Sequence, residues 1–220
     1  MYIGEILAKN FYDVKPEDSV LYVVDRMNEL HVPQLPVIDS NDYLGLVSKN
    51  DLLTAHDNTR PINSILTSLK FVYLYEYQHI YDALQYMSTN NLTVLAVLDK
   101  ENSYIGVVTQ EDLLNAVNNN MGNTRNGAII VLEVGQKDLS FSHIAHIVEA
   151  ENIRLLSMSV HEIPESTKLE VTIKVDKQHI DGLVASLWRF DYIVKATFND
   201  GSRDTDIKER YDILMNYLNL

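Results

Sequence analysis

A nine-residue segment occurs twice in this chain of 220 residues and constrains its fold more than any other feature. The copies run from Gly45 to Leu53 (GLVSKNDLL) and from Gly106 to Leu114 (GVVTQEDLL). Both read glycine, two apolar residues, a hydroxyl, two polar residues, aspartate and a leucine pair. Such a repeat indicates one supersecondary unit used more than once, and two copies are too few for a solenoid. The sequence therefore predicts a pair of related modules.

Each copy has the pattern of a hairpin that is flanked by helices. The apolar runs Leu35–Ile38 and Leu95–Leu98 end in aspartate and precede the repeated segment, which is typical of a β-hairpin. Apolar residues at helical spacing follow Ser19 and recur from Ile80, so a helix is expected before each hairpin. Each copy is predicted to contain a strand, a helix, two strands and a closing helix.

The hydroxyl and the aspartate of the motif have an interpretation that needs no ligand. Ser48 and Thr109 lie where strand gives way to helix, and an aspartate follows each of them three residues later. A hydroxyl at that position accepts from a free backbone N–H, and the acidic residue bonds back to form a capping box. On this interpretation the motif S/T-x-x-D only begins a helix.

The duplicated pattern resembles the CBS domain. This domain occurs as a tandem pair, the Bateman module, that binds adenosine nucleotides or related adenosyl compounds and regulates an attached or partner protein. The resemblance is carried by Val14–Val20, Leu35–Asp39 and Gly45–Leu53, with their second-copy equivalents. It implies a first repeat at residues 1–58 and a second at residues 59–120.

The resemblance also implies a binding site. The residues that it assigns to ribose and phosphate are Ser48, Lys49, Asp51, Thr109 and Asp112. In the family, the aspartate accepts from ribose hydroxyls and the hydroxyl lies near phosphate. Lys49 has Gln110 as its counterpart, so the first loop is better provided for phosphate, although a solvated lysine is the alternative. The residues assigned to the adenine pocket are Pro36, Val37, Tyr73, Ala96 and Val97.

Four aromatic residues precede the helix of the second copy: Phe71, Tyr73, Tyr75 and Tyr77. In a strand their period of two would place all four rings on one face. Aromatic residues dominate both packing and subunit interfaces, which is the favoured interpretation. The alternative is that one ring stacks on a purine.

The charge and composition exclude several classes of protein. With 18 Lys and Arg against 31 Asp and Glu, the net charge is −13, and clustered basic residues for gripping nucleic acid are absent from the sequence. The same charge opposes anionic ligands unless it is compensated locally. No signal peptide and no run of ~20 apolar residues is seen, so a soluble, cytoplasmic protein without membrane contact is expected.

The pattern changes after a polar linker at residues 121–126. Residues 127–200 read as βαββαβ, the split βαβ of a ferredoxin-like sandwich. This part resembles the ACT domain, best at Ser142–Val160. ACT domains that bind amino acids usually have Pro-Gly before the first helix, whereas Asp138 and Leu139 stand here, so amino-acid binding is not carried over.

The expected fold is thus α/β and α+β: a tandem CBS pair, an ACT-like domain and a C-terminal helix at residues 201–220. That helix would carry one apolar stripe, to be packed on its own chain or on a partner. His143, His146 and Glu149 share a helical face, but no fourth ligand is evident. No metal and no cofactor are therefore predicted.

The predicted function is that of a non-catalytic regulatory protein. Its CBS pair would sense an adenosine-containing ligand, of the AMP/ADP/ATP or S-adenosylmethionine class, and relay it through the ACT-like domain, as the resemblance to acetoin-utilisation-type regulators implies. A homodimer and an unidentified protein partner are expected. The alternative is a ligand-independent dimerisation or assembly module. An enzyme is disfavoured, because no nucleophile, base and orienting group can be named.

Overall fold

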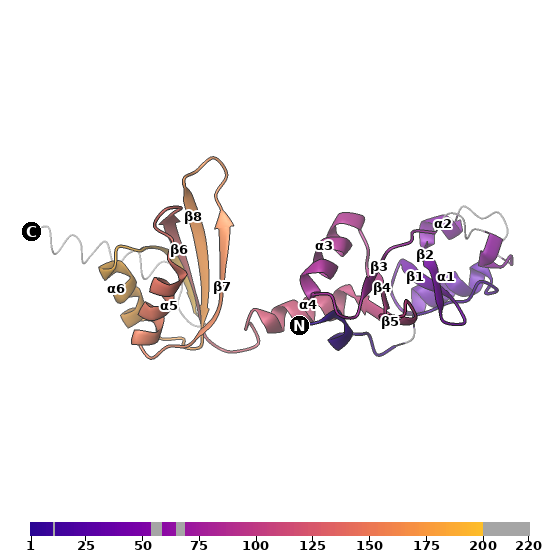
Figure 1. The fold of residues 1–220 in the computed structure, drawn as a ribbon, viewed down its shortest axis with the longest axis horizontal. Helices are drawn as coiled ribbons and strands as arrows, with labels where there is room; N and C mark the ends of the chain where they lie inside the picture. The colour runs from indigo at the N-terminus through magenta and orange to yellow at the C-terminus, as the bar shows by residue number, and fades with distance from the viewer. Residues whose placement is uncertain (11, 54–58, 65–68, 200–220) are drawn as a thin grey trace, which may run out of the picture. The chain divides into compact units, whose positions relative to one another are not determined.

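The computed structural model describes residues 1–10, 12–53, 59–64 and 69–199. Its contacts divide the chain into two compact units, residues 1–117 and 118–220, whose elements are labelled in Figure 1. The first unit holds both copies of the repeated motif, and the second holds the predicted βαββαβ sandwich. The C-terminal helix predicted at residues 201–220 lies outside the described residues.

The first repeat folds as its local sequence predicts. Its elements are α1 (Val20–Glu29), β1 (Gln34–Asp39), β2 (Asp42–Ser48) and α2 (Lys49–Leu53). Helix α1 begins at Val20 because the Ser19 hydroxyl accepts from the backbone N–H of Tyr22 at 3.2 Å. The first strand of the pattern is reduced to one parallel bridge, between Val14 and Val37.

The second repeat has the same order with a longer first strand. Its elements are β3 (Tyr73–Tyr75), α3 (Ile80–Asn90), β4 (Val94–Leu98), β5 (Tyr104–Thr109) and α4 (Gln110–Asn120). Strand β4 lies in the middle of the sheet, parallel to β3 and antiparallel to β5. The predicted order of strand, helix, two strands and helix is confirmed in this repeat.

The motif glycine makes a β-bulge in both hairpins. The register of the first hairpin shifts between Val37 and Ile38, and that of the second shifts at the equivalent position. Gly45 and Gly106 have φ angles of +140° and +148°, a region that L side chains rarely adopt. The first residue of the repeated segment is therefore required by the backbone rather than by a ligand.

Substitution of the two glycines by alanine is expected to cost different amounts of stability. A Cβ at position 45 would lie 2.8 Å from the Cβ of Leu69, whereas a Cβ at position 106 would lie 3.8 Å from Leu7. Both variants share the cost of a positive φ, but only Gly45→Ala adds overpacking. Its free energy of unfolding should fall about 1–3 kcal/mol further than that of Gly106→Ala in urea titrations. Equal losses of stability in the two variants would show that the Leu69 side chain can move aside without cost.

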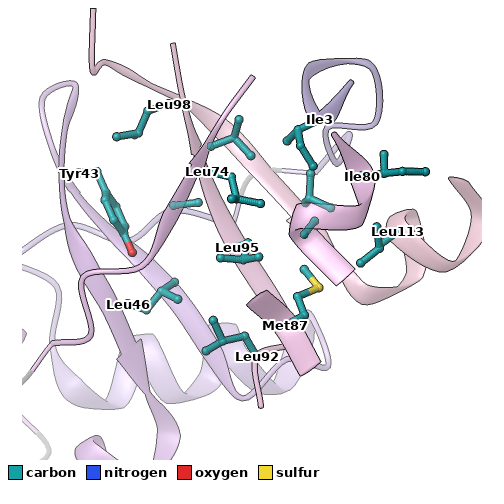
Figure 2. Close-up of a cluster of buried hydrophobic side chains, with 14 of the residues drawn as sticks. Ile3, Tyr43, Leu46, Leu74, Ile80, Met87, Leu92, Leu95, Leu98 and Leu113 are labelled. Carbon is teal, nitrogen blue, oxygen red and sulfur yellow. The ribbon is translucent and has the colours of Figure 1, made fainter. Parts of the chain in front are cut away.

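The segment that precedes each repeat packs on the other repeat. Ile3 is fully buried among second-repeat residues that include Ile80 and Leu113, as Figure 2 shows. Ile62 is likewise fully buried, but in the core of the first repeat. The segments around Ile3 and Ile62, which we call the lead-in segments, therefore each complete the core of the other repeat.

The same exchange brings backbone beside each motif strand. Ala8 donates its N–H to the carbonyl of Val107 in β5 at 2.8 Å. On the other side, Leu46 of β2 and Lys70 exchange two backbone hydrogen bonds, at 2.8 and 3.3 Å. We call residues 7–10 with 12–13 and residues 69–73 the crossing segments, because each contains a residue that is hydrogen-bonded to the motif strand of the repeat to which it is not adjacent in sequence.

The second unit is the predicted split βαβ sandwich. Its elements are β6 (Ala128–Gly135), α5 (Phe141–Ala150), β7 (Leu155–Glu162), β8 (Lys168–Val175), α6 (Asp181–Arg189) and β9 (Ile193–Asn199). The four strands form one antiparallel sheet in the order β7-β8-β6-β9. Both helices pack their buried residues against alternate residues of this sheet, and Figure 1 shows the two helices side by side. The predicted fold class is thus confirmed.

Candidate functional site

The first motif forms a reciprocal capping box at the start of α2. The Ser48 hydroxyl donates to Oδ2 of Asp51 at 2.6 Å, and the Ser48 N–H donates to the same oxygen at 3.3 Å. In return, the backbone N–H of Asp51 donates to the Ser48 hydroxyl at 3.3 Å. The capping interpretation of the sequence pattern is therefore realised.

The second motif repeats this geometry. The Thr109 hydroxyl donates to Oδ2 of Asp112 at 2.5 Å, and the Thr109 N–H donates to it at 3.2 Å. The backbone N–H of Asp112 donates to the Thr109 hydroxyl at 3.1 Å. Thr109 is buried, with 7% of its surface exposed, whereas Ser48 is half-buried. Both carboxylates thus present the same atom to the cap.

Lys49 begins helix α2, immediately after the capping hydroxyl. Its ammonium donates to the side-chain oxygen of Asn28 at 2.7 Å, and its backbone N–H donates to the carbonyl of Pro33 at 2.8 Å. The counterpart Gln110 makes the equivalent backbone bond, to Thr93 at 2.9 Å, but is exposed and uncharged. The first loop therefore carries a cation where the second loop carries an amide.

The residues predicted to line an adenine pocket lie in the cores of the repeats. Val37, Ala96 and Val97 are fully buried, and Pro36 is buried beside them. Tyr73 is half-buried and pairs with Ala96 through the parallel β3–β4 ladder. Their role in binding stays a prediction.

Comparison with known families gives the identity of the repeats. The model of the CBS domain matches residues 3–58 and residues 62–119. This chain belongs to the CBS domain family. The matched ranges contain both motifs and both crossing segments. The CBS pair, a regulatory domain, is therefore the part of the chain in which the two repeats pack on each other's segments.

The similarity to curated relatives covers only a part of each. Inosine-5'-monophosphate dehydrogenase of Methanocaldococcus jannaschii is 30% identical over 111 residues, which are 50% of this chain and 22% of that enzyme. The chain spans less than half of the length of the first curated relatives that it matches. The activity of the dehydrogenase is therefore not carried over to this chain.

Solved CBS structures give a similar picture. A CBS domain pair/ACT domain protein from Thermotoga maritima is 25% identical, with a TM-score of 0.49, over 53% of this chain and 96% of that chain. CBSX2, solved in complex with AMP, is 23% identical, with a TM-score of 0.46, over 53% of this chain and 95% of that chain. Each of these structures thus corresponds to about half of this chain.

Tyr12 is a site residue that the sequence did not reveal. It belongs to the crossing segment beside the second CBS motif. Burial and then the carboxylates of Asp112 and Glu111 raise the pKa of the Tyr12 phenol, so this hydroxyl lies within the field of the second motif. Its place in the sequence, between the lead-in and the first helix, points only to the first repeat. Tyr12 packs against the core of the first repeat, so its proximity to Asp112 comes from contact between the two repeats.

The aromatic row lies on one face, as its period of two predicts. Centroids of successive rings from Phe71 to Tyr77 are 5.4, 5.4 and 5.2 Å apart. Tyr43 of the first repeat extends the row, with its ring 5.3 Å from that of Phe71 and its hydroxyl donating to the carbonyl of Val72 at 2.8 Å. Tyr43 is buried, so the row serves to pack the two CBS repeats together at this end.

The loop before α5 in the second unit is closed by its own side chains. Leu139 packs against the core of the sandwich, and Ser140 caps α5 by accepting from the N–H of His143 at 3.3 Å. Asp138 donates its N–H to the carbonyl of Gly135 at 3.0 Å, and its carboxylate lies over that glycine. The position where ACT domains carry glycine therefore holds a core residue.

His143 is engaged by aromatic side chains. Its Nδ1 lies 3.2 Å from the hydroxyl of Tyr192, and its ring contacts that of Phe190 edge-on. Within the described ranges, no group of three or more histidine or acidic side chains is placed to hold a metal ion. In the same part of the chain, no helix is both long and apolar enough to cross a membrane.

Proposed function

We propose that this protein is a non-catalytic, cytoplasmic regulator whose CBS pair binds an adenosine-containing ligand of the AMP/ADP/ATP or S-adenosylmethionine class. The observation that carries the proposal is the duplication of the acceptor geometry in a chain of the CBS family. In both repeats a half-buried motif carboxylate accepts from the motif hydroxyl and from its backbone N–H. A carboxylate at this depth is a suitable acceptor for the hydroxyls of a ribose.

The geometry of the cap favours binding over capping alone. An N-terminal cap needs one acceptor, and Ser19 supplies it for α1 without an acidic partner. In both CBS motifs, by contrast, a charged carboxylate is held by two hydrogen bonds at a half-buried position. Rigid placement lowers the entropic cost of accepting from a ligand, which is the general advantage of a preorganised site.

A thermal-shift panel tests this function. The full chain is heated with AMP, ADP, ATP, S-adenosylmethionine and adenosine, with guanosine as the matched control. A ligand at about 100 times its dissociation constant should add about 2.7 kcal/mol of stability. Stabilisation by an adenosyl compound but not by guanosine is expected. If every compound leaves the melting temperature unchanged, the CBS pair does not bind this class.

A second candidate is a ligand-independent assembly module. The observation in its favour is that the capping boxes are complete without a ligand. In that case the hydroxyls and carboxylates of the motifs serve only to begin α2 and α4. We favour the regulatory function because the chain belongs to the CBS domain family and has both the hydroxyl and the aspartate in each repeat.

For the second unit we propose a role in assembly and signal relay. Amino-acid binding is not expected there, because that function needs the loop backbone close to the ligand, and Leu139 packs into the core at this point. Ligand binding would alter the conformation of the CBS pair. This change would alter the affinity for a partner protein or at a subunit interface, with a coupling free energy of about 1–3 kcal/mol.

We also propose a homodimer that forms through the closing helices of the CBS pair. In each motif the first leucine of the pair is buried, whereas the second, Leu53 or Leu114, is 69% or 70% exposed. Leu21 of α1 and Tyr81 of α3 are each 53% exposed as well. Apolar side chains that recur at equivalent exposed positions of both repeats suit contact with a second copy of the chain.

The double variant Leu53→Glu with Leu114→Glu is expected to be monomeric. Both side chains are exposed, so the charges should leave the fold intact while they disfavour an apolar interface. Light scattering at micromolar concentration should show twice the chain mass for the native protein and for Gln136→Glu, which adds a charge at an exposed position of the second unit. A native protein with the mass of one chain would contradict the dimer.

A further inference from the structure

The two CBS motifs have the same geometry but different charges. Between the hydroxyl and the aspartate, the first loop has Lys49 and Asn50, and the second has Gln110 and Glu111. In the first loop Lys49 therefore balances the motif aspartate. In the second loop Glu111 stands next to Asp112, so two carboxylates share one turn. Because charges near a binding site select ligands by their own charge, this difference bears on specificity.

The crossing segments enlarge the difference in charge between the two loops. Beside the first loop, the two backbone hydrogen bonds to Leu46 bring in Lys70. Along β5, the corresponding segment includes Lys9 and Asp13, and its Tyr12 lies in the field of Asp112 and Glu111. Taken together, the charged residues of the first loop and its crossing segment carry one net positive charge, and those of the second carry two net negative charges.

Tyr12 reports the negative field at the second loop. After burial, the carboxylates of Asp112 and Glu111 raise the pKa of Tyr12. A phenolate is disfavoured in this field, and so is any other anion. At the first loop, the ammonium of Lys49 donates to the neutral side chain of Asn28 at 2.7 Å.

We infer that the two loops take different adenosyl ligands: the Ser48–Asp51 loop takes a phosphorylated adenosine nucleotide, and the Thr109–Asp112 loop takes an adenosyl compound without phosphate. Adenosine and S-adenosylmethionine represent the neutral and cationic members of the second class. The inference rests on the proposed function, because it assigns a ligand class to each of the sites proposed there. On this assignment the protein responds to two different ligands, one at each loop, rather than to one.

Calorimetry on the full chain tests the assignment with ATP and adenosine as probes. One ATP per chain is expected for the native protein. Lys49→Gln copies the residue of the second loop into the first and should weaken ATP binding about tenfold, at least five times more than it weakens adenosine binding. Lys49→Arg, which keeps the charge, should bind ATP within about threefold of the native protein.

A gain-of-function variant makes the test independent of lost stability. Gln110→Lys with Glu111→Asn gives the second loop the two residues of the first and should raise the ATP stoichiometry from one to two per chain. Two equal ATP sites in the native protein would overturn the inference, and so would a double variant that still binds one ATP. Failure of the native protein to bind any adenosyl compound would instead overturn the proposed function, and this inference with it.

Discussion

The double variant Asp51→Asn with Asp112→Asn is expected to lose measurable binding of adenosyl ligands. Each carboxylate accepts from ribose hydroxyls in the proposed complex, and hydrogen bonds to a charged group contribute about 1.5–3 kcal/mol. Affinity at each site should therefore fall about 10-fold to 150-fold. Asparagine keeps an oxygen that can accept within the capping box, so the fold should persist. Calorimetric titration of each single variant assigns the loss to one loop.

The matched control removes the other half of each capping box. Ser48→Ala with Thr109→Ala deletes the hydroxyls that cap α2 and α4, at a cost of about 0.5–2 kcal/mol of stability for each cap. On our account, the aspartate variants lose binding with little change in stability. If they lose as much stability as the alanine variants and bind ligand normally, the motifs are helix caps and the assembly-module function is correct.

Ile3→Ala is expected to destabilise the CBS pair by about 2–5 kcal/mol, although the residue lies at the start of the chain. Its side chain is fully buried in the core of the second repeat, in contact with the cluster drawn in Figure 2. Tyr2→Ala is the control, because the neighbouring Tyr2 is 57% exposed. Urea unfolding measures both variants. A loss below about 1 kcal/mol for Ile3→Ala would show that the lead-in segment is not part of this core.

The elements that follow local rules could be predicted from the sequence. The hairpins, the helices that begin after Ser19 and His79, and the βαββαβ order were all indicated by periodicity and turn chemistry. His79 is instructive, because the second copy lacks the serine of the first. Its ring nitrogen nevertheless accepts from the N–H of Tyr81 at 3.3 Å, so a different side chain supplies the same cap.

The end of the second CBS repeat shows the limit of composition. The asparagines at positions 118–120 favour a loop on propensity, yet α4 continues through them to Asn120. Helix α4 is anchored by the buried residues Leu113 and Ala116, and its exposed last turn follows without further cost to the core. The turn comes at Gly122, which has a φ of +71°.

The composition of the site could be predicted only in part. The repeat identified the hydroxyls and the carboxylates, because both lie within one continuous motif. Tyr12 and Lys70 could not be placed there from sequence, since each reaches its position through contacts between the two repeats. The lead-in segments are exchanged because Ile3 and Ile62 pack against residues that are distant in the sequence. The spacing of apolar residues within a segment does not reveal such contacts.

Calorimetric titration of the native 220-residue chain with AMP, ADP, ATP and S-adenosylmethionine is the most direct test of the central claim. The account predicts saturable binding of at least one of these ligands with a dissociation constant well below about 1 mM, which corresponds to more than about 4 kcal/mol of binding free energy. The binding should disappear in the Asp51→Asn, Asp112→Asn double variant. The absence of saturable heat for all four ligands would contradict a sensing role for the CBS pair.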